Sequence, residues 1–281
     1  MVKQRLVILF LLISYTCYSE IKVTITDIHV ILPKAIFATK YDTISFNKTF
    51  ENSFDYFWCE IQPIQSNYDK TNSDDFLMPD KIIYKINVIG NKQTYSLISS
   101  KLGTSYIACL NKSDYKLKSD TFAEKRPIHL IENSSIIQIV IRQNNSYLGY
   151  LTELINIPFV LPPVNIIEFG HQTDLRIGSD CAELAIYGKR RQGYKIPYCG
   201  PYRIVDFLDE LEKDKLFEGC IVHFGSQVSV LYQDNGVKNV LDKDDILIQS
   251  YLSKVCFVSY LNSGFYNKDY NIYKWKYKYV N

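Results

Sequence analysis

The sequence has little net charge and no long basic segment. Its 281 residues include 32 Lys and Arg against 30 Asp and Glu, which leaves a formal net charge of +2. The longest basic run is Lys189-Arg190-Arg191, and we interpret it as a solvated helix face, the usual place of charged side chains. Since nucleic-acid-binding proteins depend on basic patches, we predict no nucleic-acid partner.

Long apolar runs are also missing. The chain begins with Lys3 and Arg5, continues with the short apolar run Leu6–Ile13, and then has small or polar residues up to Ser19. This is the pattern of a secretory signal peptide, and the run is too short to span a bilayer. We therefore predict a signal peptide over residues 1–19, no transmembrane helix, and export to the periplasm, the cell envelope or the extracellular space.

Cys17 lies where the cysteine of a lipoprotein is found. The preceding Ser14-Tyr15-Thr16 departs from the usual Leu-x-small pattern, so a lipid anchor at Cys17 is an open alternative to plain secretion.

Metal-binding motifs are absent as well. The sequence has seven cysteines but no Cys-x-x-Cys and no His/Cys cluster with ligand spacing, so we predict no metal site and no cofactor.

In an oxidising compartment we expect Cys59 to pair with Cys109, because both lie in strand-like segments. Pairings among Cys199, Cys220 and Cys256 stay open.

The acidic residues form no pair that suits glycoside hydrolysis, which needs two facing carboxylates. The run Asp242-Lys243-Asp244-Asp245 lacks the glycine and the terminal glutamate of an EF-hand loop. We interpret it as a solvated loop.

Alternating apolar and polar residues indicate strands in the first half, separated by turn-rich segments. Regularly spaced short strands are typical of a sandwich, and Trp58 beside Cys59 is faintly immunoglobulin-like. We predict a β-sandwich domain over residues 20–147. The expected strands are Ile21–Thr26, Phe54–Ile61, Lys81–Ile89, Thr104–Leu110 and Ser135–Arg142.

The second half mixes helices and strands, so the predicted fold class is α+β, with a second domain over residues 148–281. The expected helices are Tyr147–Asn156, the segment after Asp180, and the amphipathic Ile204–Leu216. The expected strands are Ile221–Phe224, Val228–Tyr232, Ile246–Tyr251 and Val255–Tyr260, and the tail Ser263–Asn281 is expected to be an edge strand or a surface arm.

The helix that begins near Asp180-Cys181 carries the clearest chemical signal. Gly178 and Ser179 indicate a loop that ends in an N-cap, so Cys181 falls in the first turn. A thiol there feels the partial positive charge of the helix N-terminus, which favours the nucleophilic thiolate. Cys181 is therefore our candidate nucleophile, and a buried structural cysteine is the alternative.

The order of segments around this helix resembles the NlpC/P60 family of papain-like cysteine peptidases and amidases. The resemblance covers about residues 150–251, a little over a third of the chain. The segments that carry it are Ile157-Pro158-Phe159-Val160, Gly178-Ser179-Asp180-Cys181, Ile196-Pro197-Tyr198, Gly219–Phe224 and Gln227–Leu231.

The resemblance implies a papain-like domain and hydrolysis of an amide bond through a Cys181 thioester, with a peptide or a peptidoglycan-like cell-wall material as substrate. At the position of the family's catalytic histidine this chain has Gln227, which does not titrate. Gln249 matches the family's third polar position, the residue that fixes the orientation of the catalytic base. We take His223 as the candidate base, on the same strand as Gln227 but about 13 Å along it if the strand is straight, and His171 as the auxiliary candidate with Asp180.

Two functions from different classes follow. The first is an exported cysteine peptidase or amidase, and the retained Asp180-Cys181 favours it. The second is a non-catalytic binding or adhesion protein with a degenerate papain-like domain, and Gln227 favours it.

Overall fold

The computed structural model describes residues 20–26, 29–30, 35–48, 56–67, 81–92, 94–111, 121–124, 136–166, 169–251 and 254–279. Strands outnumber helices and form several sheets, which confirms the mixed α+β class. The expected signal peptide and Cys17 lie outside the described residues. Within the described ranges, the model contains no helix with the length and apolar character that crossing a membrane requires.

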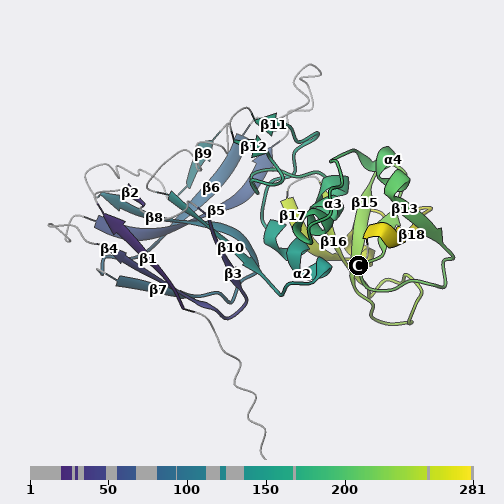
Figure 1. Cartoon of the computed structure of the whole chain (residues 1–281), viewed down its shortest axis with the longest axis horizontal. Coiled ribbons are helices and arrows are strands. Elements are labelled where there is room, and N and C mark those ends of the chain that lie inside the picture. Colours follow the sequence, from purple (N-terminus) through teal and green to yellow (C-terminus); the bar gives the residue numbers. More distant parts are fainter. Residues whose placement is uncertain are drawn as a thin grey trace, which may run out of the picture.

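Two sheets form the first half of the chain, shown in Figure 1 at the left. Their strand orders are β2-β1-β4-β7 and β3-β10-β8-β5-β6-β9. The bounds are β1 Glu20–Thr26, β2 His29–Val30, β3 Ala35–Thr39, β4 Thr43–Lys48, β5 Tyr56–Asn67, β6 Lys81–Gly90, β7 Thr94–Ile98, β8 Gly103–Asn111, β9 Thr121–Glu124 and β10 Ile136–Arg142.

The inner faces of these two sheets share one hydrophobic core. Ile44 and Phe46 from β4 pack with Trp58 from β5 and Ile107 from β8, and all four side chains are buried. The Trp58 indole Nε1 donates to the carbonyl of Lys92 at 3.0 Å. Two sheets that bury alternate residues against each other form a sandwich, as the alternation in the sequence indicated.

The expected disulfide between Cys59 and Cys109 is wrong. Strands β5 and β8 are neighbours in one sheet, where Cys59 pairs with Ala108 and Cys109 pairs with Trp58. Because successive residues of a strand point to opposite faces, Cys109 lies in the sandwich core and Cys59 lies in a cluster on the other face. No disulfide joins them.

The second half begins directly after β10. It contains a six-stranded sheet with the strand order β13-β18-β14-β15-β16-β17 and the two-stranded sheet β11-β12. The bounds are α2 Tyr147–Leu151, η2 Thr152–Leu154, β11 Asn165–Ile166, β12 Gly170–His171, α3 Cys181–Arg191, α4 Pro201–Ile204, η3 Val205–Phe207, β13 Leu208–Leu211, β14 Ile221–His223, β15 Val228–Gln233, β16 Ile246–Tyr251, β17 Lys254–Ser259, η4 Tyr260–Asn262, β18 Asn271–Trp275 and η5 Tyr277–Tyr279.

This six-stranded sheet has a hydrophobic core on each face. On one face α3 packs in a core with Val228, Val230 and Ile248, so the helix that carries Cys181 lies across β15 and β16. On the other face Val222 and Leu231 pack with residues of the loops that follow β15 and β17. The sheet therefore separates the surroundings of Cys181 from those loops.

Two element predictions in the second half are wrong. Only the short helix α4 and one 3-10 turn form at the start of Ile204–Leu216, and Leu208–Leu211 is strand β13. The tail does not add an edge strand, because β18 pairs with β13 on one side and β14 on the other. Leu208 lies opposite Trp275, and helical spacing of the leucines in the sequence does not reveal a strand partner so far along the chain.

The basic run at the end of α3 is not a solvated face, contrary to our interpretation. Lys189 is buried, with its Nζ over the Tyr147 ring at 4.8 Å. Arg190 and Arg191 form ion pairs with Asp174 and Glu153, each at 2.9 Å. The run therefore fixes α3 within the second half.

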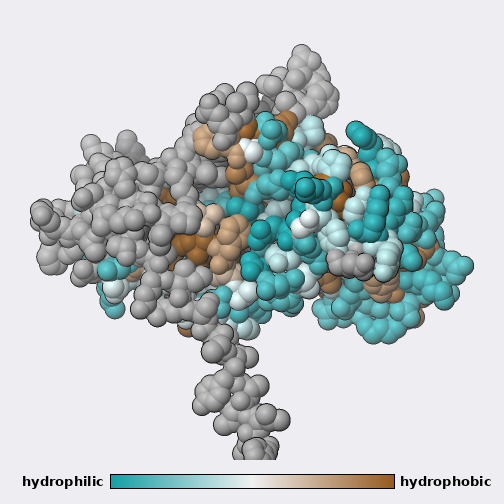
Figure 2. All heavy atoms as spheres, in the orientation of Figure 1, coloured by the Kyte–Doolittle hydropathy of each residue, from teal (hydrophilic) through white to brown (hydrophobic). Residues whose placement is uncertain are grey.

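In the view of Figure 2 the surface of the second half is mostly hydrophilic, with hydrophobic residues in small groups. No broad apolar face is visible there on the part of the chain that the structure describes.

Candidate functional site

Helix α3 begins one residue later than the sequence suggested. Its N-cap is Asp180, whose backbone is extended and whose Oδ1 accepts a hydrogen bond from the Glu183 N–H at 2.8 Å. Ser179 instead belongs to the preceding loop, where its carbonyl accepts from the Ser250 hydroxyl at 2.8 Å. Cys181 is therefore the first residue of the helix, as a nucleophilic cysteine requires.

The Cys181 thiol is buried, with 4% of the residue exposed. It lies against the backbone of Val228 on β15. Burial, together with the nearby Asp180 carboxylate, raises the pKa of Cys181 to about 12. The positive end of the helix, which would lower this pKa, is outweighed because desolvation and a neighbouring negative charge both disfavour the thiolate.

His223 and Gln227 do not share one strand, which corrects our prediction. Gly225 has φ of 82° and forms a tight turn with Ser226, so that the Phe224 N–H donates to the Gln227 carbonyl at 2.8 Å. His223 therefore lies directly across from Val228 on the neighbouring strand. Opposite residues of an antiparallel pair point to the same face, so His223 is on the α3 side of the sheet.

The His223 ring is nevertheless held by other partners. Its Nε2 donates to the Pro201 carbonyl at 2.8 Å, and its Nδ1 accepts from the Gly225 N–H at 3.1 Å. The Tyr273 ring packs on it edge to face at 5.9 Å between centroids. Both ring nitrogens are engaged, and among the described residues no hydrogen bond joins either one to Cys181.

The two glutamines lie apart from each other. Gln227 is buried beside Val228, and its amide donates to the carbonyls of Val228 and Ser250 at 3.1 and 3.2 Å. Gln249 accepts from the Ser229 hydroxyl at 3.1 Å and donates to the Ser263 carbonyl at 3.2 Å. Its strand neighbours Ile248 and Ser250 face α3, so Gln249 faces the opposite side of the sheet and does not orient a base at Cys181.

His171 lies close to the start of α3, but beside Glu183. Its Nδ1 accepts from the Thr173 N–H at 3.3 Å and lies 3.6 Å from the Glu183 Oε2, while the Thr173 hydroxyl donates to that same oxygen at 2.6 Å. Burial, followed by the negative charge of Asp180, raises the pKa of Glu183 to about 9. Burial also lowers the pKa of His171. At neutral pH this contact therefore joins two uncharged groups.

A second layer holds His171 in place. The Tyr198 ring stacks on the imidazole at 4.3 Å between centroids. The Tyr198 hydroxyl donates to Asp174 at 2.7 Å, and Asp174 also pairs with Arg190 at 2.9 Å. The N-terminus of α3 is thus covered by a packed polar cluster of His171, Thr173, Asp174, Glu183, Arg190 and Tyr198, which we call the α3 cap cluster.

Sequence reasoning missed Glu183 as a member of this cluster, although a signal was present. Asp180 and Glu183 stand three residues apart, the spacing of a capping box. That spacing places Glu183 at the third position of the helix, next to the residues that cover its N-terminus. No sequence signal of this kind marks Thr173 or Tyr198. Each joins the cluster through contacts with residues that are distant in sequence.

The arrangement at Cys181 offers a buried thiol that, in the described part of the chain, has no hydrogen bond to an imidazole. Two pockets in the described part of the chain, of about 680 and 290 Å³, lie elsewhere, and neither is lined by Cys181, His171 or His223. Among the described residues no cluster of three or more His, Cys, Asp or Glu side chains has the geometry of a metal site.

No protein-family model matches this chain, and no curated protein matches it.

Proposed function

We propose that this chain is a non-catalytic binding protein, exported from the cell, whose second half resembles an NlpC/P60-type cysteine hydrolase without a working catalytic centre. The observation that carries the proposal is the state of Cys181, a buried thiol that contacts the Val228 backbone and, among the described residues, has no hydrogen bond to an imidazole. The domain would then serve to engage a partner at the cell surface or in the cell wall.

The chemistry of the thiol supports this proposal. Burial raises the pKa of Cys181 to about 12, so the thiol stays protonated at neutral pH, whereas the thiolate is the form that attacks a carbonyl. The helix N-terminus does not compensate, because the Asp180 carboxylate already accepts one of its free N–H groups. The N–H groups of Cys181, Ala182 and Val228 lower the pKa of the thiol, but burial and the Asp180 carboxylate raise it by more.

The missing base supports it independently. Gln227 stands at the position where the resemblance places the catalytic histidine, and an amide neither accepts nor releases a proton at neutral pH. The Gln227 amide also bonds to the Val228 and Ser250 carbonyls, so it has a structural role of its own.

A cysteine hydrolase with His223 as its base is the second candidate. It is favoured by one observation, that His223 lies across from Val228 on the same sheet face as Cys181. For this function the His223 Nε2 would have to exchange the Pro201 carbonyl for the Cys181 sulfur. Such an exchange requires the His223 ring to leave the Pro201 carbonyl at the start of α4.

The rate of iodoacetamide labelling at Cys181, followed by peptide mass spectrometry from pH 5 to 10, separates the two candidates. We expect the labelling rate to show no rise at a pH below the ordinary thiol pKa of about 8.5. The plot of rate against pH should be the same in His223→Ala. Gln227→His is the matched variant, because it returns an imidazole to the expected position. Denatured protein gives the rate for a fully accessible thiol.

A reactive fraction near pH 6 to 7 that disappears in His223→Ala would contradict the proposal. It would show that Cys181 and His223 form a working pair in solution, and the hydrolase would then be the better account.

A further inference from the structure

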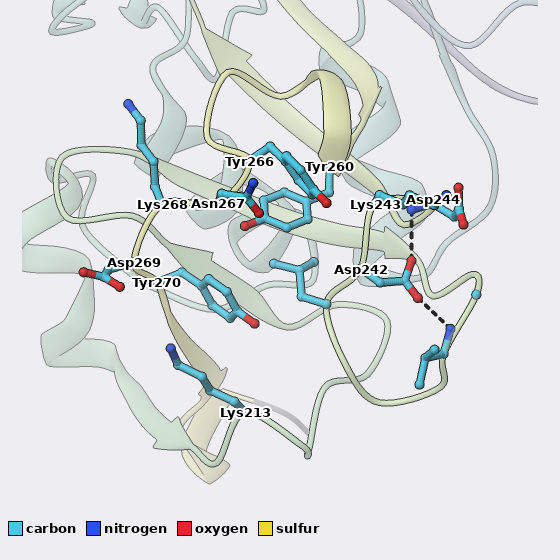
Figure 3. Close-up of a pocket in the computed structure, with 13 residues that line it drawn as sticks. Lys213, Asp242, Lys243, Asp244, Tyr260, Tyr266, Asn267, Lys268, Asp269 and Tyr270 are labelled. Atoms are coloured by element: carbon cyan, nitrogen blue, oxygen red, sulfur yellow. Dashed lines mark hydrogen bonds between the residues drawn. The ribbon is translucent and has the colours of Figure 1, made fainter.

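The larger pocket lies on the face of the second sheet opposite α3. It has a volume of about 680 Å³, within the ~300–1,000 Å³ typical of small-molecule sites. Three segments line it, namely Lys213 after β13, residues 236–244 between β15 and β16, and residues 260–270 between β17 and β18. Figure 3 shows these segments converging around Tyr260, Tyr266 and Tyr270.

Tyrosine rings form the apolar part of the pocket. Tyr260 is buried, and its ring contacts Tyr266 at 5.2 Å and Tyr270 at 6.3 Å between centroids, both edge to face. Tyr266 is 39% exposed, so part of its ring is open to a ligand. Lys213 places its Nζ 4.5 Å from the centre of the Tyr270 ring. The rings thus offer flat apolar surfaces edged by polar groups.

The opposite wall is a loop organised by its own hydrogen bonds. The two Asp242 oxygens accept from the N–H groups of Val237 at 2.6 Å and Asp244 at 2.9 Å. The buried Asp245 accepts from the N–H groups of Asn235 and Asp242 at 2.7 and 2.8 Å. This corrects our interpretation of the Asp242–Asp245 run as merely solvated, and it means that this wall is formed before any ligand arrives.

Gly236 shows how closely this loop is packed. It has φ of 63°, and a Cβ built on it would lie 2.3 Å from an Asp242 oxygen. Only glycine suits this position. The loop therefore places the Asp242 carboxylate at the pocket in a fixed orientation, as the dashed lines in Figure 3 indicate.

The charges that line the pocket cancel. Lys213, Lys243 and Lys268 are matched by Asp242, Asp244 and Asp269. The three carboxylates offset the attraction of the three lysines for a phosphorylated or sulfated ligand, and a lipid chain would meet six charged residues among the thirteen that line the pocket. The lining instead combines hydrogen-bond acceptors for hydroxyl groups, ammonium donors for ether and hydroxyl oxygens, and ring faces for C–H groups.

We propose that this pocket binds an uncharged oligosaccharide, with a sugar ring on Tyr266 and its hydroxyl groups on Asp242 and Lys243. A pyranose has apolar C–H faces and a rim of hydroxyl groups, which match the ring surfaces and the polar rim of the pocket. The inference goes beyond the proposed function, because the pocket is separated from Cys181 by the sheet and stands whether or not the thiol is reactive.

Isothermal titration calorimetry of the full chain with cellotetraose and tetra-N-acetylchitotetraose tests it. We expect saturable binding of at least one of the two, weakened roughly tenfold in Tyr266→Ala by the loss of one aromatic contact. Tyr202→Ala is the matched control, since Tyr202 is 72% exposed and does not line the pocket. It should bind as the unchanged chain does, and so should Cys181→Ser.

Three results would overturn the inference. The first is no binding of either tetrasaccharide at millimolar concentration. The second is binding that Tyr266→Ala leaves unchanged. The third is stronger binding of dextran sulfate or of a tetraalanine peptide than of the neutral sugars, which would assign the pocket to an anion or a peptide. Since none of these measurements depends on the reactivity of Cys181, failure here is distinguishable from failure of the proposed function.

Discussion

Two buried carboxyl groups stand at the start of α3, and both bind protons more tightly than usual. Burial raises the pKa of Asp180 to about 6 and that of Glu183 to about 9. Burial lowers the pKa of His171, the basic group beside Glu183, so at neutral pH His171 offers no positive charge that would favour the ionised form of Glu183. The α3 cap cluster is therefore assembled around an acid that stays protonated at neutral pH.

Glu183→Gln should remove a pH dependence of stability. The pKa of Glu183 is about 9 in the folded chain and 4.5 when unperturbed, so the folded state retains a proton that the unfolded state releases. The stability linked to that proton is complete below pH 4.5 and is lost progressively as the pH rises to about 9, at about 1.4 kcal/mol per pH unit. Glutamine has no proton to lose, so the variant should have a shallower decline.

Urea unfolding at pH 5, 7 and 8.5 measures this difference. Glu212→Gln, at an exposed position after β13, is the control and should keep the slope of the unchanged chain. Equal slopes for Glu183→Gln and the unchanged chain would show that Glu183 is ionised in the folded state.

The sequence predicted part of this site. The N-terminal position of Cys181 on a helix follows from local signals, since a loop, a capping residue and helical spacing are all visible within a few residues. The burial of the thiol and the protonation of Glu183 do not follow, because both depend on β15 and on the loop around His171. A pKa is set by neighbours in space, and these are not neighbours in sequence.

Among the elements, α2 and α3 pack together most closely at Gly188. A Cβ built at Gly188 would lie 2.7 Å from both Leu151 and Tyr147 side-chain carbons. The Tyr147 hydroxyl also donates to the Ala185 carbonyl at 3.1 Å. Glycine is unfavourable within a helix by about 1 kcal/mol, so this contact explains why α3 carries one.

Gly188→Ala should destabilise the protein despite its better helix propensity. Overpacking a buried contact costs about 1–3 kcal/mol and the propensity gain is about 1 kcal/mol, so we expect a net loss of up to about 2 kcal/mol in the free energy of unfolding. Urea unfolding of the variant tests this. Gly200→Ala is the control, because nothing lies within 4 Å of its added Cβ, and its effect should stay within about 0.5 kcal/mol. A more stable Gly188→Ala variant would show that α2 moves aside freely.

Some strands were predicted at nearly their true bounds, such as β6 and β16, whereas β3, β4 and β7 were not predicted. The wrong helix prediction in the second half has a physical cause. Segment Ile204–Leu216 has leucines at helical spacing, yet Leu208–Leu211 is a strand because β18 lies beside it. Pairing between segments this far apart is a tertiary effect, and it overrides a local preference that is weak in a segment with so few apolar residues.

The whole molecule has separate hydrophobic cores joined by polar contacts. The sandwich core contains only residues before Arg142, and the cores of the second sheet contain only residues after Ser146. Between them, the Thr104 N–H donates to the Ile155 carbonyl at 3.0 Å. Gln138 also accepts from Arg176 at 3.0 Å.

Glu153 is the central residue of this junction. It is fully buried and pairs with Arg142 from β10 at 3.2 Å and with Arg191 from α3 at 2.9 Å. The Tyr187 hydroxyl donates to it as well. A buried carboxylate shared by arginines from both halves couples their stabilities, because removing it leaves both guanidinium groups without their partner.

We therefore expect the two halves to unfold together, and the two tryptophans of the chain allow a direct test. Trp58 lies in the sandwich core and Trp275 in the core beside α3. In Trp275→Phe the fluorescence reports only the first half, and in Trp58→Phe only the second. In each variant the fluorescence midpoint in urea should coincide with the midpoint by circular dichroism, which follows the whole chain.

Glu153→Ala, made in each single-tryptophan background, tests the cause of this coupling. Breaking a buried ion pair from one side costs about 3–5 kcal/mol, so both fluorescence midpoints should move to lower urea by similar amounts. Tyr277→Ala, at an exposed position near the C-terminus, should move neither. If Glu153→Ala shifts only the Trp275 signal and leaves the Trp58 signal in place, the halves fold independently, and the arginine contacts across the junction contribute little to the stability of the sandwich.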